Sequence, residues 1–140
     1  MVAGLLGLLC LGGVGVAISL YDGATEIKRT APDAVVDNFV RAYLVNRDEK
    51  EVQLYACKSG ADFAQLDAYR TDIENRESRY SMSIQVTWEG LRVSTNGTKG
   101  SVELDLTRAI QDGSEQITNT WRFDVVDQDG WRVCGANEVK

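Results

Sequence analysis

Histidine is absent from this chain of 140 residues, and proline occurs once. Without histidine the chain lacks the commonest general base, the commonest zinc ligand and the usual partner of a serine or cysteine nucleophile. We therefore expect no metal, no other cofactor and none of the hydrolase chemistry that depends on histidine. The hydrophobic share of 44% is too high for a disordered chain, so a folded core is expected.

Basic residues are also few. Fifteen Lys and Arg stand against 21 Asp and Glu, which gives a formal net charge of -6, and no basic run is present. Nucleic-acid-binding domains carry basic patches that neutralise phosphates, so we expect no nucleic-acid partner. The length allows one folded domain once a membrane segment is subtracted.

Charge is missing altogether from the amino-terminal segment before Asp22. Residues 2–21 form an uncharged, mostly apolar stretch that would cover roughly the 30 Å of a bilayer core as a helix. Signal peptides have a shorter apolar region behind a basic start, so the stretch favours an uncleaved membrane anchor over residues 1–22. A cleavable signal remains the alternative, because Gly15 and Ala17 have the spacing that a signal peptidase accepts.

Three cysteines are present, and Cys10 lies in the apolar stretch. Cys57 and Cys134 have neither CxxC redox spacing nor a metal-ligand cluster around them, which favours a structural disulfide over two buried thiols. Closing so long a loop would stabilise the fold by about 4 to 5 kcal/mol. Disulfides persist in oxidising compartments. Together with the anchor, the bridge predicts a single-pass protein of the cell membrane with its folded domain on the extracytoplasmic side.

Helical periodicity covers the chain up to about residue 80. Thr30 and Pro32 indicate a helix start, and Val36, Phe39 and Tyr43 follow at spacings of three and four. A short second helix is predicted over 48–57. A third begins near Asp62, with one face directed to the core and a solvated face that carries Arg70, Asp72, Glu74 and Arg76.

From Tyr80 the hydrophobic period changes to two, which predicts a half-buried strand from Tyr80 to Trp88. Further strands are predicted over 91–95, 100–110, 115–126 and 131–134. The dipeptides Asn96-Gly97 and Asp112-Gly113 are typical of two-residue hairpins. Helices followed by an antiparallel meander define an α+β fold with the helices on one face of a curved sheet.

This order of elements resembles the nuclear transport factor 2-like superfamily, a cone in which a bent sheet wraps a long helix. The chain is most similar to its bacterial single-pass membrane-anchored members, the Mce-associated and type IV secretion scaffold-like domains. The resemblance rests on the anchor, the opening helix PDAVVDNFVRAY (32–43), a cysteine after the second helix and the closing segment DGWRVC (129–134). It covers about residues 30–135. We therefore divide the chain after the anchor into a short stalk at 23–30, the domain at 31–136 and a tail at 137–140.

Enzymes of this superfamily place ionisable residues on the inner wall of the cone. Strand alternation here directs Glu103, Asp105 and Asp124 to the outer face, and Asn119 and the Tyr80 hydroxyl are the only polar groups that it directs inward. With no inward carboxylate to act as a base, we expect no enzymatic activity.

Two non-catalytic functions remain. The resemblance implies an accessory or scaffold domain of an envelope transport or secretion assembly, which would contact other envelope proteins or a second copy through the outer sheet face. The alternative is a cone cavity for a small apolar, lipid-like ligand. The residues that would line this cavity are more often part of an ordinary core: Tyr43, Tyr80, Trp88, Asn119, Trp121 and Phe123.

Cys134 raises a difficulty for the predicted bridge. If Trp131 and Val133 face inward, strict alternation directs Cys134 outward, away from the helices. A β-bulge, an earlier end of the strand or a second helix that reaches around the rim would each remove the conflict.

Overall fold

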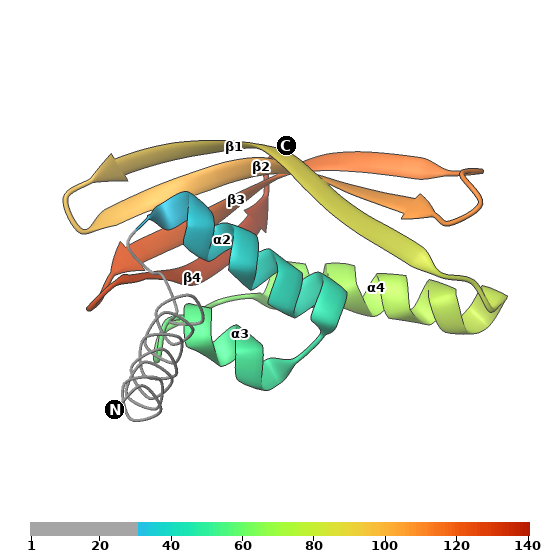
Figure 1. Cartoon of the computed structure of the whole chain (residues 1–140), viewed down its shortest axis with the longest axis horizontal. Helices are drawn as coiled ribbons and strands as arrows, with labels where there is room; N and C mark the ends of the chain where they lie inside the picture. The colour runs from blue at the N-terminus through green and yellow to red at the C-terminus, as the bar shows by residue number, and fades with distance from the viewer. Residues whose placement is uncertain (1–30) are drawn as a thin grey trace, which may run out of the picture.

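The computed structural model describes residues 31–140 (Figure 1). The predicted anchor over 1–22, the stalk over 23–30 and the predicted helix cap Thr30 lie outside the described residues. Between residues 31 and 140, no helix is both long enough and apolar enough to cross a membrane.

The helices lie where the periodicity predicts them. Helix α2 (Pro32–Val40) continues into the π-helical turn η1 (Arg41–Asn46), and α3 (Glu49–Tyr55) and α4 (Ala64–Tyr80) follow. Pro32 opens α2 after the N-cap Ala31, and Asp33 lies in the first turn, where a negative charge is favourable. Asp48 caps α3 by accepting the backbone N–H groups of Lys50 and Glu51 at 3.0 and 3.4 Å.

Tyr80 is a correction to the predicted strand over 80–88. It is the last residue of α4 and is 59% exposed, and Ser81 ends the helix in a left-handed conformation with φ of 51°. Strand β1 (Ile84–Asn96) therefore begins later than predicted. The apolar residues of this segment do alternate with polar ones, but the first of them belongs to the helix, and only those from Ile84 onward belong to the sheet.

The sheet is an antiparallel meander in the order β1-β2-β3-β4. It comprises β1, β2 (Lys99–Ile110), β3 (Gln116–Asp127) and β4 (Trp131–Glu138). The two runs predicted over 80–88 and 91–95 belong to one strand, whose register shifts between Glu89 and Arg92 at Gly90, a residue with φ of 69°. This bulge bends β1.

The turns also differ from the prediction. Asn96 pairs with Lys99, so the first hairpin turns at Gly97 and Thr98 rather than at Asn96-Gly97. Residues 111–115 connect β2 to β3, which is a longer connection than the predicted two-residue hairpin, and Gly113 supplies the positive φ of 78°.

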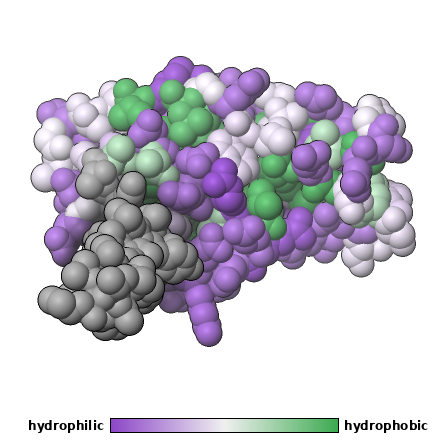
Figure 2. Space-filling view, viewed as in Figure 1, coloured by the Kyte–Doolittle hydropathy of each residue, from purple (hydrophilic) through white to green (hydrophobic). Residues whose placement is uncertain are grey.

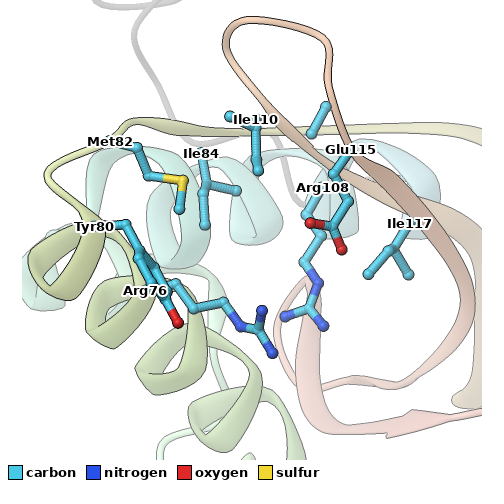
Figure 3. A pocket seen from close by; sticks show the side chains of 9 residues that line it. Arg76, Tyr80, Met82, Ile84, Arg108, Ile110, Glu115 and Ile117 are labelled. Carbon is cyan, nitrogen blue, oxygen red and sulfur yellow. The ribbon is translucent and has the colours of Figure 1, made fainter.

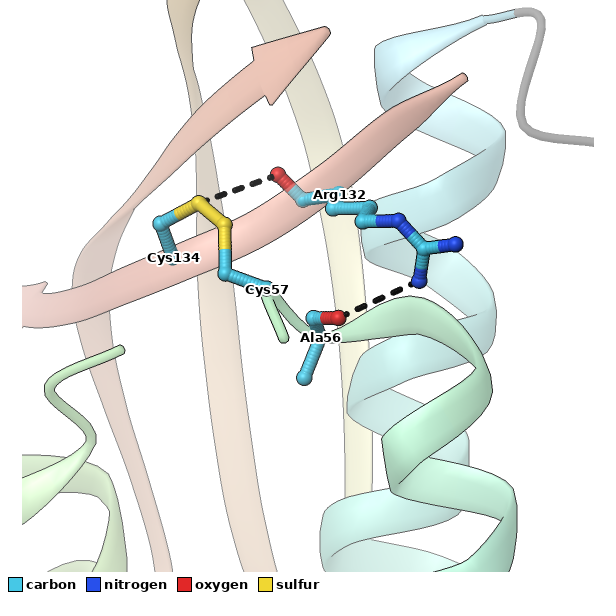
Figure 4. The surroundings of a disulfide bond; sticks show 4 residues. All are labelled: Ala56, Cys57, Arg132 and Cys134. Atoms are coloured by element: carbon cyan, nitrogen blue, oxygen red, sulfur yellow. Dashed lines mark hydrogen bonds between the residues drawn. A yellow bond between two sulfur atoms is a disulfide. The ribbon is translucent and has the colours of Figure 1, made fainter. Parts of the chain in front are cut away.

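A bulge in β4 resolves the difficulty with Cys134. Val125 pairs with Val133 and Asp124 pairs with Gly135, so Cys134 is the extra residue between the two pairs. The segment after α3 lies along this edge of the sheet, where the Cys57 N–H donates to the Val133 carbonyl at 2.8 Å. The predicted disulfide between Cys57 and Cys134 is confirmed, with 5.0 Å between the two Cα atoms (Figure 4).

Buried Arg132 lies beside the bridge. Its Nη1 donates to the carbonyl oxygen of Ala56 at 3.3 Å, which further ties β4 to the end of α3 (Figure 4). Strand β4 then continues to Glu138, so Asn137 and Glu138 belong to the sheet rather than to the tail predicted over 137–140.

All described helices lie on one face of the sheet, and the strands bend over them (Figure 1). The core fills the space between these layers. Its largest fully buried side chains are Phe39, Phe123, Leu44, Leu66, Ile73, Leu104 and Leu106. On the face seen in Figure 2 hydrophilic residues prevail, and the hydrophobic ones gather in separate places rather than in one broad patch. The α+β class and the single core predicted from the sequence are confirmed.

Candidate functional site

The six side chains proposed to line a cavity do not come together around one. Tyr43, Trp121 and Phe123 are packed into the core, with 5%, 3% and 0% of their surface exposed. Phe39 contacts both Tyr43 and Phe123, with ring centroids 5.5 and 6.2 Å apart. This part of the cone is filled, which agrees with the ordinary core that the sequence also allowed.

Trp88 belongs to β1 and is half-buried, and its side chain contacts α2. Its indole Nε1 donates to Asp37 Oδ1 at 2.8 Å, and the Arg41 guanidinium lies 5.6 Å from the centre of its ring system. Arg41 also pairs with Asp37 at 3.5 Å. Trp88 thus connects the sheet to the opening helix and contributes to the fold rather than to a cavity.

Tyr43 makes a polar contact on the side of the core away from the sheet. Its hydroxyl donates to Asp67 Oδ1 at 3.2 Å, and the Arg70 guanidinium lies 4.3 Å from its ring centre. Burial raises the pKa of the Tyr43 hydroxyl to about 12, although the positive charge of Arg70 opposes the shift. The tyrosine therefore stays protonated, as a hydrogen-bond donor between two helices.

Asn119 donates to Glu138 Oε1 at 3.1 Å. Glu138 pairs across the sheet with Trp121, which faces the core, so the Glu138 side chain points to the same inner face. This corrects the expectation that no carboxylate faces inward. The last strand was predicted to end at Cys134. It continues to Glu138, and the bulge at Cys134 exchanges the inward-facing and outward-facing positions in the rest of β4.

The side chains of Tyr69 and Trp121 contact one another. Their rings are 5.4 Å apart in an edge-to-face arrangement, and both the Tyr69 hydroxyl and the Trp121 Nε1 are buried without a hydrogen-bond partner among the described residues. Burial raises the pKa of Tyr69 to about 12, and the positive charge of Arg108 acts in the opposite direction. The Arg108 guanidinium lies 5.2 Å from the Tyr69 ring centre.

Arg108, which contacts Tyr69, also lines an open cavity of ≈ 240 Å³. This cavity lies between the end of α4, the start of β1 and the β2–β3 hairpin (Figure 3). Of the six predicted residues, Tyr80 alone belongs to it. We call this space the mouth cavity. Its lining is mostly apolar, with two arginines and one glutamate: Arg76, Tyr80, Met82, Ile84, Arg108, Ala109, Ile110, Glu115 and Ile117.

The two arginines of the mouth cavity share one carboxylate oxygen. Arg108 Nη1 and Arg76 Nε donate to Asp72 Oδ2 at 2.7 and 3.0 Å. The hydrogen bond from Arg108 holds the pKa of Asp72 below its usual value; desolvation opposes this shift, and Arg76 adds to it. Asp72 therefore stays ionised and fixes both guanidinium groups at the edge of the cavity.

Sequence reasoning missed these residues for two different reasons. The alternation that directs Leu104 and Leu106 inward also directs Arg108 inward, so this residue could have been predicted by following the strand two residues further. Asp72 and Arg76 were assigned to a solvated helix face. The side chains of Asp72 and Arg76 are 45% and 48% exposed. They belong to the site only because Asp72 contacts Arg108 in the folded structure, which the helix sequence does not show.

The one carboxylate in the lining of the mouth cavity is Glu115, on the exposed connection between β2 and β3. Glu138 is not part of the lining and accepts a hydrogen bond from Asn119. Across residues 31–140 there is no group of three or more His, Cys, Asp or Glu residues that could hold a metal ion.

No protein-family model and no curated protein sequence matches this chain. Solved structures do match it. A "putative ketosteroid isomerase" from Shewanella frigidimarina superposes with a TM-score of 0.57 at 15% identity, over 79% of this chain and 95% of that chain. A Nostoc punctiforme protein of unknown function with a cystatin-like fold gives a TM-score of 0.54 at 11% identity, over 74% and 84% of the two chains.

Bd1075 from Bdellovibrio bacteriovorus is similar over a smaller part of its own length. It matches with a TM-score of 0.52 at 12% identity, over 74% of this chain and 37% of Bd1075. Identities this low show the fold and carry no activity across. The class that fold and site define is an α+β domain with helices on one face of a bent antiparallel sheet, a filled core and an open cavity at one end of the sheet.

Proposed function

We propose that this protein is a non-catalytic binding domain, held at the extracytoplasmic face of the membrane by residues 2–21, that takes a small and largely apolar ligand into the mouth cavity. The observation that carries the proposal is the cavity itself, with Met82, Ile84, Ile110 and Ile117 in its lining. Small-molecule sites are concave, mostly apolar and supplied with a few polar groups, and the mouth cavity has each of these properties.

The disulfide and the uncharged stretch support the location. The Cys57–Cys134 bridge is of the kind that persists in oxidising compartments, and residues 2–21 are long enough to anchor the chain in a bilayer. The membrane-anchored bacterial type within the superfamily is proposed on the same grounds.

Ligand binding is tested by filling the cavity. The full chain, purified from membranes and placed in lipid nanodiscs, should release a small apolar compound on extraction with organic solvent. Ile110→Trp, which inserts a larger side chain into the cavity, should abolish this recovery. Val93→Trp is the matched control, because Val93 is an exposed strand residue outside the cavity lining. Equal recovery from both variants would refute the proposal.

A second candidate function is an accessory or scaffold role in an envelope assembly. The helices cover one face of the sheet and leave the other face of β1, β2 and β3 uncovered by described residues (Figure 1). Side chains on this outer face form a charged ladder, in which Arg122 donates to Glu103 at 3.2 Å and Arg92 lies 3.6 Å from Asp105. A polar surface of this kind suits a transient contact with a protein in the same membrane.

The scaffold role is tested by crosslinking in intact membranes followed by affinity purification of the full chain. A crosslinked partner protein that is lost in Arg122→Glu would support the role, with Lys58→Glu as the control because Lys58 is exposed and lies outside the sheet. A crosslink between two copies of this chain would assign the face to self-association instead. Absence of any crosslink dependent on Arg122 would contradict the scaffold role.

A further inference from the structure

Two arginines from distant parts of the chain meet at one side of the mouth cavity. Arg76 comes from α4 and Arg108 from β2, and Figure 3 shows their guanidinium groups pointing toward one another while Met82, Ile84 and Ile110 lie on the other side. The cavity thus has a cationic end and an apolar end. This polarity matches a molecule with a negative head group and a short hydrocarbon chain.

The shared carboxylate leaves most of the donor capacity of this pair unused. A guanidinium carries five N–H donors. Asp72 receives one bond from Arg76 Nε and one from Arg108 Nη1, and the hydrogen bonds of the described residues include no other for either side chain. The remaining N–H groups are available to a bidentate acceptor such as a carboxylate.

Arg108 is also held in place before any ligand arrives. Its side chain is 19% exposed, bonded to Asp72 and stacked against the Tyr69 ring at 5.2 Å. A side chain that is already ordered loses little conformational entropy on binding, which favours affinity. One carboxylate neutralises one of the two guanidinium charges, so the pair keeps about one positive charge.

Glu115 limits which anions would bind. It lines the same cavity as the two arginines, and no ion pair joins it to either of them among the described residues. A head group at the arginines would be attracted by two guanidinium groups and repelled by the one Glu115 carboxylate, and a multiply charged head group would be repelled most.

We propose that the mouth cavity binds a small amphipathic anion, with a singly charged carboxylate or equivalent head group on Arg76 and Arg108 and a short apolar chain against Met82, Ile84 and Ile110. This inference rests on the proposed ligand-binding function and specifies the head group. A cavity of about 150 Å³ accommodates benzene. The ≈ 240 Å³ of the mouth cavity therefore suits a chain about the size of octanoate.

The test compares two probes of equal chain length, octanoate and octan-1-ol, on the full chain in lipid nanodiscs with empty nanodiscs as the blank. Methyl NMR signals of Met82, Ile84, Ile110 and Ile117 report occupancy of the cavity itself. Octanoate should shift these signals saturably and bind at least about fivefold more tightly than octan-1-ol, as expected for a charge-assisted hydrogen bond at a half-exposed site.

Three substitutions sharpen the comparison. Arg76→Gln should remove most of the preference for octanoate, so that the two probes bind with similar affinities. Glu115→Gln should raise the octanoate affinity about two- to threefold, because it removes a like charge from the lining. Arg79→Gln is the control for overall charge, since Arg79 lies on the same helix but outside the lining, and it should leave both affinities near those of the unchanged chain.

The outcomes separate the head-group inference from the function on which it rests. Equal binding of octanoate and octan-1-ol at the cavity methyl groups would overturn the anion inference and leave ligand binding standing. No shift with either probe would overturn both. A preference for octanoate that survives Arg76→Gln and is lost in Arg79→Gln would assign the effect to general electrostatics and refute the site.

Discussion

Asp72 holds two arginines that come from different layers of the molecule, and its ionisation is therefore coupled to folding. The hydrogen bonds from Arg108 and Arg76 lower its pKa from the ordinary value of 3.8. A carboxyl group whose pKa is lower in the folded state contributes stability that is present above its unfolded pKa and is lost as the pH falls through the folded pKa.

Asp72→Asn should accordingly lower the free energy of unfolding at neutral pH by less than about 1 kcal/mol, because the side chain is 45% exposed and water screens its pairs. The difference from the unchanged chain should shrink as the pH falls below 3.8. Urea unfolding of the full chain in detergent across this range measures it. Glu89→Gln, on an exposed residue, is the control. A deficit for Asp72→Asn that is independent of pH would contradict the coupling.

Trp88 offers a second test at the scale of one residue. Replacing it by Phe removes the hydrogen bond of 2.8 Å from Nε1 to Asp37 and keeps an aromatic ring. We expect a loss of about 1 kcal/mol beyond that of Trp131→Phe, a half-buried tryptophan that packs on the same core. Thermal unfolding of the two variants compares them directly. Equal losses would show that the contact with Asp37 adds nothing to stability.

At the scale of the elements, periodicity predicted the helices and strands because each depends on which face is buried. Periodicity does not locate a β-bulge, since a bulge depends on the strand opposite. The bulge at Cys134 was one of three explanations that the sequence left open, and the one at Gly90 was not predicted. The bulge at Cys134 places that cysteine against the segment after α3 and directs Glu138 inward. Strict alternation therefore gave the correct outer face for Glu103 and Asp105, whereas Glu138, assigned to the tail, received no face at all.

The mouth cavity was predictable only in part for a related reason. Arg108 follows from the alternation of β2, but its partner Asp72 lies on a helix whose orientation against the sheet is a tertiary property. Tyr80 was predicted in the cavity lining for the wrong reason, because it lines the mouth cavity from the end of a helix rather than from a strand. Local pattern therefore predicted the layers better than the site between them.

The carboxyl end of β4 gives a prediction for an element. Deleting residues 137–140 removes the pairing of Asn137 with Arg122 and of Glu138 with Trp121, together with the hydrogen bond from Asn119 to Glu138. We expect a loss of about 2 kcal/mol, since each net hydrogen bond contributes about 1 kcal/mol. Deletion of Lys140 alone, which lies beyond β4, is the control and should be neutral. Melting temperatures of the two truncated chains decide whether this segment is strand or tail.

At the scale of the whole molecule, one disulfide joins the segment after α3 to the last strand of the sheet. Its two cysteines are 77 residues apart, and between them lie α4 and the first three strands. In the chain-entropy account, a loop of this length stabilises the fold by about 4 to 5 kcal/mol, a large fraction of the stability of a small domain. The oxidation state of the pair therefore bears on where the domain folds.

If residues 2–21 deliver the domain to the extracytoplasmic side, the full chain isolated from bacterial membranes should contain the bridge. Denatured without reductant, it should then show one reactive thiol, from Cys10, and three after reduction. A chain that lacks residues 2–21 and stays in the cytoplasm should show both Cys57 and Cys134 as reactive thiols, because reducing compartments keep such pairs open. The shortened chain should also unfold at lower urea concentration until it is oxidised in vitro. Two additional reactive thiols in the membrane-bound full chain would contradict the extracytoplasmic location, and they would leave the fold and the mouth cavity to be explained for a domain facing the cytoplasm.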